Sequence, residues 1–387
     1  MTSGVARPST IVRTGSGALE LLLDRGPLTR AQLGELTGLS KVTASQLVER
    51  LEERGLVSRV GEQAGGRGPN ASLYAVVPSS AFVVGVDVGP ELAVAACADI
   101  TGQVLGRVEQ STHDSEDPVG VVHKAVIEAA HSARAPLAKV RRVVLGSPGL
   151  VDPNTGDLSF VFDLPLWQRG LLAALRDDLK RAVVFENDVN LAAVAEAHTG
   201  AAKGVDDFVL LWLDRGVGMA VVLGGRLHRG VSGAAGEIGY LPVAGAPVPH
   251  GGRAKGGFKE LAVADAVRAV AREHGFRAPT AQEAVRAAID AGTAGAPVLD
   301  ELAQRLALGL AAACLALDPA LVVLAGEVGL AGGVALAQRV QREVAEIAPV
   351  SPRVVVSEVA AEPVLHGALL TALDATRDEV FGSTIGA

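Results

Sequence analysis

The sequence has few aromatic residues for its hydrophobic content. Aromatic side chains make up 3% of the 387 residues, whereas hydrophobic residues make up 49%. The core must therefore be built from Val, Leu, Ala and Ile, which is typical of parallel sheets covered by helices. A chain of this length exceeds one ordinary domain. We therefore expect two or three compact units and an α/β body.

Cysteine is scarce, and no apolar run is long enough to cross a bilayer. Cys97 and Cys314 lie far apart, without CxxC spacing and with no secretory leader ahead of them, which favours a reducing cytoplasm over a disulfide scaffold. The most apolar run, residues 306–317, is about half of a membrane span and is followed at once by Asp318 and Pro319. This run predicts a buried helix, and no membrane contact is expected.

Basic charge is concentrated at the front of an otherwise acidic chain. The formal net charge is −8, which argues against a protein that coats nucleic acid indiscriminately. Residues 1–77 hold nine Lys and Arg against seven Asp and Glu, a balance of +2, and the remainder therefore holds −10. Only the front end is suited to contact phosphates.

The front end has the pattern of a helix-turn-helix. Apolar residues recur at helical spacing over residues 17–26. Thr29 and Gln32 form a capping box that predicts a short second helix, and residues 38–40 are a tight break whose Ser40 can cap a third. The third helix has an apolar face at Ala44, Leu47, Val48 and Leu51.

The opposite face of this third helix is polar and mildly basic. Its residues are Lys41, Thr43, Gln46 and Arg50. Side chains of these types can reach base edges and phosphates when a second helix enters a major groove. The alternative is a solvated helix face. The strand-like segments 57–60 and 73–77 favour DNA binding because they flank a glycine-rich loop with Arg67 near its tip, which is typical of a wing that reaches the minor groove.

We therefore predict a winged helix-turn-helix over residues 1–77, a linker over 78–81 and a body over 82–387. Strands and helices alternate along the body, as an α/β sheet requires. One apolar strand, 181–185, ends near Asn187 and Asp188, where an open α/β sheet exposes its ligand crevice. A carboxylate there can bind a ligand hydroxyl or act as a base, and capping the next helix is the alternative for Asp188.

Five motifs follow one another along the chain: Gly65-Gly-Arg-Gly-Pro69, Val84-Gly-Val-Asp-Val-Gly89, Gly146-Ser-Pro-Gly149, Glu186-Asn-Asp-Val-Asn190 and Arg229-Gly-Val-Ser-Gly-Ala-Ala-Gly-Glu-Ile-Gly239. Together they resemble the ROK family of sugar kinases and sugar-responsive repressors, which share an actin-like, two-lobed ATPase fold. The resemblance spans nearly the whole chain. Kinases of this family generally lack a DNA-binding front end, so the resemblance implies the branch of N-acetylglucosamine and xylose repressors.

The resemblance also implies which residues bind a ligand. Asp188 matches the position of the kinase base, which in a sensor accepts a hydrogen bond from the sugar hydroxyl. The positions implied to contact a sugar-like effector are Ser147, Asn187, Asp188, Glu237, Tyr240 and Glu260.

The chain departs from the kinases of the family at the phosphate positions. Pro90 and Glu91 replace a Gly-Thr step, which removes one backbone donor and adds negative charge. Asp214 and Arg215 stand in a second phosphate segment, and Glu327 stands where a glycine lets adenine approach. We therefore expect no cofactor, no catalytic residue and no kinase activity.

The zinc positions of the family are also replaced. Its cysteines fall on Gly251, Arg253 and Phe258, and its metal-binding histidine falls on Tyr240. His250 alone does not make a zinc site, so no metal is expected.

The sequence thus predicts a transcription regulator, a repressor, that binds a palindromic double-stranded operator as a homodimer or tetramer and senses a sugar-like effector. Two alternatives remain. The first is an active sugar kinase with a DNA-binding extension. The second is a repressor whose body only dimerises.

Overall fold

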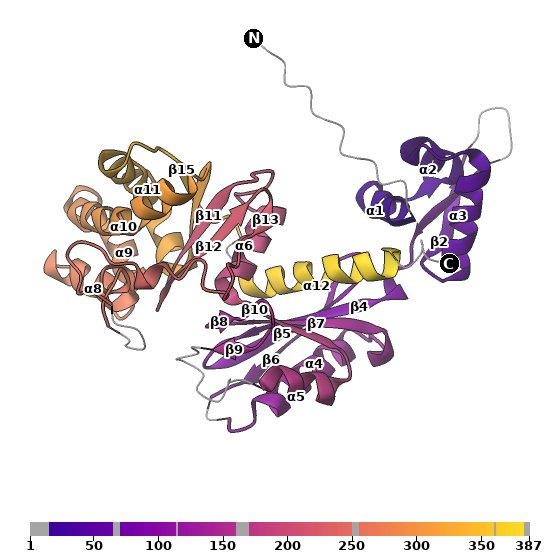
Figure 1. Ribbon diagram of the computed structural model, residues 1–387, viewed down its shortest axis with the longest axis horizontal. Helices are drawn as coiled ribbons and strands as arrows, with labels where there is room; N and C mark the ends of the chain where they lie inside the picture. Colours follow the sequence, from indigo (N-terminus) through magenta and orange to yellow (C-terminus); the bar gives the residue numbers. More distant parts are fainter. Residues whose placement is uncertain are drawn as a thin grey trace, which may run out of the picture.

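A computed structural model describes residues 15–64, 70–113, 115–159, 170–249, 255–359 and 361–382. Figure 1 shows a small head and a body of two lobes, with the C-terminal helix α12 (Pro363–Gly382) running from the body to the head. The 3-10 turn η1 (Pro78–Ser80) joins the head to the first strand of the body. No helix in the described part of the chain is long and apolar enough to cross a membrane.

The head has the architecture of a winged helix. Its helices are α1 (Gly15–Arg25), α2 (Arg30–Thr37) and α3 (Lys41–Glu53). Its sheet has the order β1-β3-β2, built from β1 (Leu28–Thr29), β3 (Ala71–Val76) and β2 (Val57–Gln63). Both predicted caps are present: Thr29 and Gln32 exchange side-chain hydrogen bonds with each other's backbone amides, and Ser40 accepts one from the amide of Thr43. The predicted winged helix-turn-helix is confirmed.

The first lobe is a five-stranded sheet in the order β10-β7-β4-β5-β6. Its strands are β4 (Phe82–Val88), β5 (Leu92–Asp99), β6 (Val104–Ser111), β7 (Val140–Ser147) and β10 (Ala182–Asn187). The strands β4, β7 and β10 are parallel, so their carboxyl ends meet at one edge. Two helices, α4 (Pro118–Ser132) and α5 (Leu171–Leu179), cover one face, and α12 covers the other. The 3-10 turn η2 (Leu137–Lys139) and a hairpin of β8 (Leu150–Val151) and β9 (Leu158–Ser159) complete this lobe.

The second lobe is another five-stranded sheet, in the order β13-β12-β11-β14-β15. Its strands are β11 (Phe208–Leu213), β12 (Val217–Leu223), β13 (Arg226–Leu227), β14 (Leu321–Ala325) and β15 (Arg353–Val356). Its main core lies between this sheet and a layer of helices. These are α7 (Lys259–Ala262), α8 (Ala264–Glu273), α9 (Ala281–Asp290), α10 (Ala296–Leu317) and α11 (Gly326–Ile347), with the 3-10 turns η3 (Ile238–Tyr240) and η4 (Gly292–Ala294).

Helix α6 (Asp188–Thr199) packs between the two sheets. Leu191 belongs to the core shared by the first sheet and α12, whereas Val189 and Ala192 belong to a core on the second sheet. A helix that is buried on both sides needs apolar residues around most of its circumference. Because α6 begins directly after β10, the first residues of this shared helix lie where the two lobes meet.

The segments expected from the sequence agree with the observed elements to within a few residues. The run 306–317 is the second half of α10 and is largely buried, as predicted. Cys97 and Cys314 are buried free thiols, and burial raises the pKa of each thiol, to about 12 and about 11.

Candidate functional site

A cleft of about 750 Å³ lies where the two lobes face each other. The first lobe contributes the residues that follow the carboxyl ends of β4, β7 and β10. The second lobe contributes the turn between β11 and β12, the 3-10 turn η3, and the start of α7. Ligand crevices of open α/β sheets occur at this edge, so the position of the cleft agrees with the prediction for Asn187 and Asp188.

Asn187 and Asp188 occupy the junction between β10 and α6 and both line the cleft. Asn187 is the N-cap of α6: its Oδ1 accepts from the amide of Asn190 at 3.1 Å, and its Nδ2 donates to the carbonyl of Gly149 at 3.0 Å. Asp188 is the first helical residue, and its Oδ1 accepts from the amide of Val189 at 2.8 Å. The capping alternative for Asp188 is therefore wrong, because its neighbour is the cap.

Glu237 and Tyr240 line the opposite side of the cleft, from η3. The ammonium group of Lys259 lies 4.3 Å from the centre of the Tyr240 ring, a cation–π contact that holds both side chains at the cleft. Burial raises the pKa of Glu237, and the negative charge of Asp188 raises it further. Glu237 and Asp188 therefore act on each other across the cleft.

The carboxylates of the cleft are harder to ionise than ordinary ones. Burial raises the pKa of Asp188 to about 6, against the lowering effect of backbone hydrogen bonds. The pKa of Asp87, at the end of β4, rises to about 7 because of burial and then because of the charges of Asp188 and Glu362. Burial also raises the pKa of Asp214. A protonated carboxyl group can donate to a ligand hydroxyl and an ionised one can accept from it, so these groups can bind hydroxyls in either form.

Two predicted ligand contacts are not among the residues that line the cleft. Ser147 is buried, and its hydroxyl donates to the carbonyl of Pro148 at 3.1 Å. The Oε1 of Glu260 accepts from the amide of Gly256 at 2.7 Å. The structure thus brings together Asn187, Asp188, Glu237 and Tyr240, while direct ligand contacts by Ser147 and Glu260 stay predictions.

The sequence did not indicate four charged residues that line the cleft: Asp87, Asp214, Arg215 and Lys259. Asp87 lies inside a motif, and Asp214 and Arg215 lie in a turn for which the resemblance implied only phosphate binding. Lys259 precedes Glu260, and no periodic pattern in this four-residue helix shows which of the two faces the cleft.

The two turns at the phosphate positions use their backbone donors internally. The amide of Gly89 donates to the carbonyl of Leu92 at 2.9 Å, and Pro90 lines the cleft without an amide hydrogen. In the other turn, the amide of Asp214 donates to the carbonyl of Gly216 at 3.0 Å, and its carboxylate accepts from the amide of Arg215 at 2.7 Å. A phosphate needs several free backbone donors, and the amides of Gly89, Asp214 and Arg215 are already paired within these turns.

One of the positions that match the family's zinc ligands lies in the core. Phe258 is fully buried and packs against Gly309 of α10, where a Cβ atom would lie 2.7 Å from the ring. Tyr240 is occupied by its contact with Lys259. Gly251, Arg253 and His250 lie outside the described residues. Within the described ranges, no three His, Cys, Asp or Glu side chains are grouped as a metal site.

The predicted DNA-reading residues of α3 are all exposed: Lys41, Thr43, Gln46 and Arg50. The residues on the other face of the helix, Ala44, Leu47, Val48 and Leu51, are buried in the core of the head. Arg67 lies in segment 65–69, outside the described residues.

Comparison with known families identifies the body. The model of the ROK family matches residues 83–375. The chain belongs to the ROK family. The model of the MarR family matches residues 15–68, which hold the helices and most of the sheet of the head. The predicted fold and the resemblance to this family are confirmed.

Relatives of this ROK protein include a repressor, a regulator structure and a kinase structure. The N-acetylglucosamine repressor of Escherichia coli is 26% identical over 236 residues, which are 60% of this chain and 58% of the repressor. The match thus spans less than two thirds of that relative. A ROK family transcriptional regulator, a homolog of the E. coli MLC protein, has a TM-score of 0.78 at 20% identity over 96% of this chain and 97% of its own. The ROK hexokinase from Thermus thermophilus has a TM-score of 0.65 at 28% identity and covers 77% of this chain and 99% of its own.

Proposed function

We propose that this ROK protein is a transcription regulator, acting as a repressor, that binds a sugar-like ligand in its cleft without phosphorylating it. The observation that carries the proposal is the composition of one cleft. Asn187, Asp188 and Glu237 remain where hydroxyls would bind, whereas Pro90 and Asp214 occupy the turns where phosphates would lie. The repressor relative, and the regulator structure that matches both head and body, support this assignment.

The charges of the cleft oppose a nucleotide. Four carboxylates line it: Asp87, Asp188, Asp214 and Glu237. Only Arg215 and Lys259 oppose them among the lining residues. Where these carboxylates are ionised, a triphosphate would meet a net negative wall. In coupled assays of ATP consumption with hexoses, pentoses and amino sugars, we expect no turnover. A rate on the order of 1 per second, ordinary for an enzyme, would establish the kinase alternative instead.

The DNA-binding part of the proposal rests on the exposed face of α3. We assign residues 1–77 to the head, 78–81 to the linker and 82–387 to the body. Lys41 and Arg50 supply charge for phosphates, Gln46 can bond to base edges, and Arg67 is proposed to reach the minor groove. Two-fold symmetric proteins bind inverted repeats, so we propose that a homodimer or tetramer binds a palindromic operator in the cytoplasm.

Helix α12 supplies a connection between cleft and head. Near its start, Val364 lines the cleft. At its end, Val380 and Phe381 are buried in the core of the head, next to residues of α1 (Figure 1). The guanidinium of Arg377 donates to the carbonyl of Ile100 at 3.0 and 3.1 Å, which also ties this end to the turn between β5 and β6.

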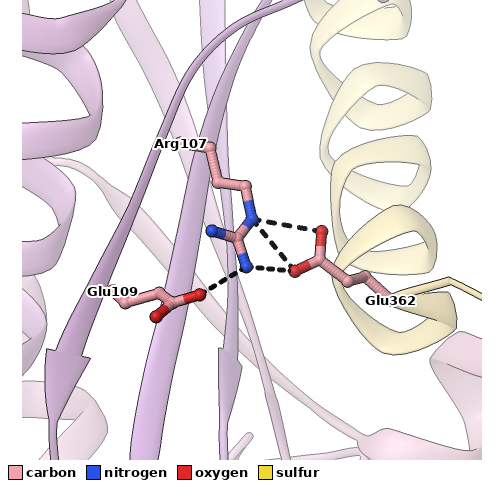
Figure 2. A network of polar contacts seen from close by, with 3 residues as sticks. All are labelled: Arg107, Glu109 and Glu362. Carbon is pink, nitrogen blue, oxygen red and sulfur yellow. Dashed lines mark hydrogen bonds and ion pairs between the residues drawn. The ribbon is translucent and has the colours of Figure 1, made fainter.

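The start of α12 is held by a network of charges. Arg107 of β6 binds both oxygens of Glu362 through Nε, at 3.0 and 3.3 Å, and also binds Glu109 (Figure 2). Glu362 immediately precedes α12 and has a left-handed φ of 47°. Its charge contributes to the raised pKa of Asp87. A ligand that alters the charge at Asp87 therefore acts electrostatically on the residue that anchors α12.

Helices α6 and α12 pack with their backbones in close contact. A Cβ atom at Gly367 would overlap the carbonyl oxygen of Leu191, so only glycine permits this approach. His198 of α6 also lies 3.3 Å from Asp374 of α12. Because Asp188 opens α6, a ligand that moves the start of α6 also moves α12 and, through it, the head.

Two measurements on the full chain test the proposal. Selection from a library of random DNA duplexes should yield an inverted repeat, and thermal unfolding with sugars and sugar phosphates should identify a ligand, because bound ligand raises stability by mass action. The ligand should then change operator affinity in an anisotropy titration. Failure to select any sequence contradicts the proposed regulator. A selected operator without any stabilising ligand supports the alternative of a repressor whose body only dimerises.

A further inference from the structure

The DNA-reading face of α3 carries an exposed apolar residue. Val42 is 67% exposed, more than Val60 at 54%, the other exposed large hydrophobic residue in the described part of the head. It is the second residue of α3, between Lys41 and Thr43. The other aliphatic residues of this helix point into the core. Packing inside the head therefore does not explain why a valine stands at this position.

Val42 lies on the part of α3 that enters a groove. Recognition helices contact base edges with the residues near their N-terminus, and α3 begins with Lys41 after the Ser40 cap. Residues four positions apart share a helix face, so Val42 lies beside Gln46, which is also exposed. The side-chain amide of Gln46 and the isopropyl group of Val42 are thus neighbours on the surface of α3.

The polar neighbour of Val42 is already engaged. The hydroxyl of Thr43 lies 2.8 Å from the hydroxyl of Ser40, and the Ser40 hydroxyl accepts from the Thr43 amide at 3.2 Å. These contacts hold the Thr43 hydroxyl at the helix cap. A hydrogen bond from Thr43 to a base edge would therefore compete with this local contact, whereas Val42 remains exposed to solvent.

We propose that Val42 is a specificity-determining residue that contacts the 5-methyl group of a thymine in the major groove. This inference rests on the proposed function. Thymine is the only one of the four bases that presents a methyl group there, and apolar side chains recognise it by excluding water from both surfaces. One buried methyl group corresponds to about a fourfold change in affinity. Val42 thus selects thymine at one position of each half-site.

The experiment removes the thymine methyl group and the Val42 side chain separately. An operator is selected from random duplexes with the full chain, and each thymine is then replaced singly by deoxyuridine, which lacks only the methyl group. With the unaltered chain, one thymine per half-site should show about a fourfold loss of affinity. With Val42→Ala, the same replacement should cost less than about twofold. Alanine favours an exposed helix position, so the head should still fold.

Val334→Ala is the matched control, because Val334 is 64% exposed but lies on α11, far along the chain from the head. It should give the same uracil profile as the unaltered chain. An identical uracil profile for Val42→Ala and the unaltered chain overturns the inference. Equal weakening of selected and random DNA by Val42→Ala also overturns it, because the residue would then contribute no discrimination. If no sequence is selected at all, the proposed regulator fails together with this inference.

Discussion

At the scale of single residues, Asn187 and Asp188 both line the cleft, but only Asn187 also caps α6. The side chain of Asn187 binds the amide of Asn190 and the carbonyl of Gly149. The sequence indicated the pair because both residues follow a strand in a motif. It did not show which of them was the cap, because Asn and Asp are almost equally good caps and the choice depends on backbone angles at one position.

Replacement of Asp188 by alanine should weaken ligand binding by one to two orders of magnitude. A hydrogen bond to a charged group contributes about 1.5–3 kcal/mol, which corresponds to this range. Calorimetry with the ligand found by thermal unfolding measures the loss, and anisotropy with operator should show normal DNA binding that no longer responds to ligand. Glu327→Ala is the control, because Glu327 is exposed and does not line the cleft. An Asp188→Ala protein that responds normally would place the sensing site elsewhere.

Asp87 should give the protein a measurable pH dependence. Its pKa in the folded chain is about 7, above the ordinary 3.8, so the folded state keeps a proton that the unfolded state releases. Stability is therefore lost as the pH rises from about 4 to 7. Asp87→Asn mimics the protonated form and should gain, relative to the unaltered chain, on the order of 1 to 3 kcal/mol between pH 4 and pH 8.

Thermal unfolding of both proteins across this pH range measures the effect of Asp87. Asp177→Asn provides a control of opposite sign, because the side-chain hydrogen bond from Lys180 lowers the pKa of Asp177. This exposed residue should contribute only a small change. A difference between Asp87→Asn and the unaltered chain that stays constant from pH 4 to pH 8 would contradict the raised pKa.

At the scale of elements, the sequence predicted contacts within the head but not the contact between the head and α12. The caps at Thr29 and Ser40 involve partners three residues away, so both partners were visible within one short segment. Phe381 and Leu19 belong to one core although they lie near opposite ends of the described chain, and no local pattern records this. The carboxylate of Glu260 accepts from the amide of Gly256, only four residues earlier, but this contact lies in a bend and follows no helix or strand period.

Phe381→Ala should loosen the head from the body. Phe381 is buried in the core of the head, and truncation of a buried phenylalanine costs about 3–5 kcal/mol. Hydrogen exchange of α1 should therefore accelerate by about a hundredfold or more, while exchange in β4 stays unchanged. The ligand should no longer alter operator affinity. Glu379→Ala is the control, since the exposed Glu379 only pairs with Arg142 at 3.6 Å. Unaltered exchange in α1 would show that α12 does not hold the head.

At the scale of the whole molecule, the proposed pairing of heads makes binding depend on half-site spacing. Insertion of five base pairs between the half-sites turns one of them to the opposite side of the duplex, because one helical turn takes about 10–10.5 base pairs. We expect at least a tenfold loss of affinity, with recovery when ten base pairs are inserted. Substitution of the same base pairs without a change in length is the control. Affinity that ignores spacing would mean that each head binds alone.

Helix α12 can also convert a small tilt at the cleft into a larger displacement of the head. Its 20 residues make a rod about 30 Å long. A tilt of about 10° at the cleft would carry the far end through about 5 Å, which exceeds the ~3.4 Å between successive base pairs. In a two-fold pair the heads would move in opposite senses, so their separation would change by about twice that distance. If the proposed coupling holds, a slight movement at the cleft is enough to change the register of both reading helices with their half-sites.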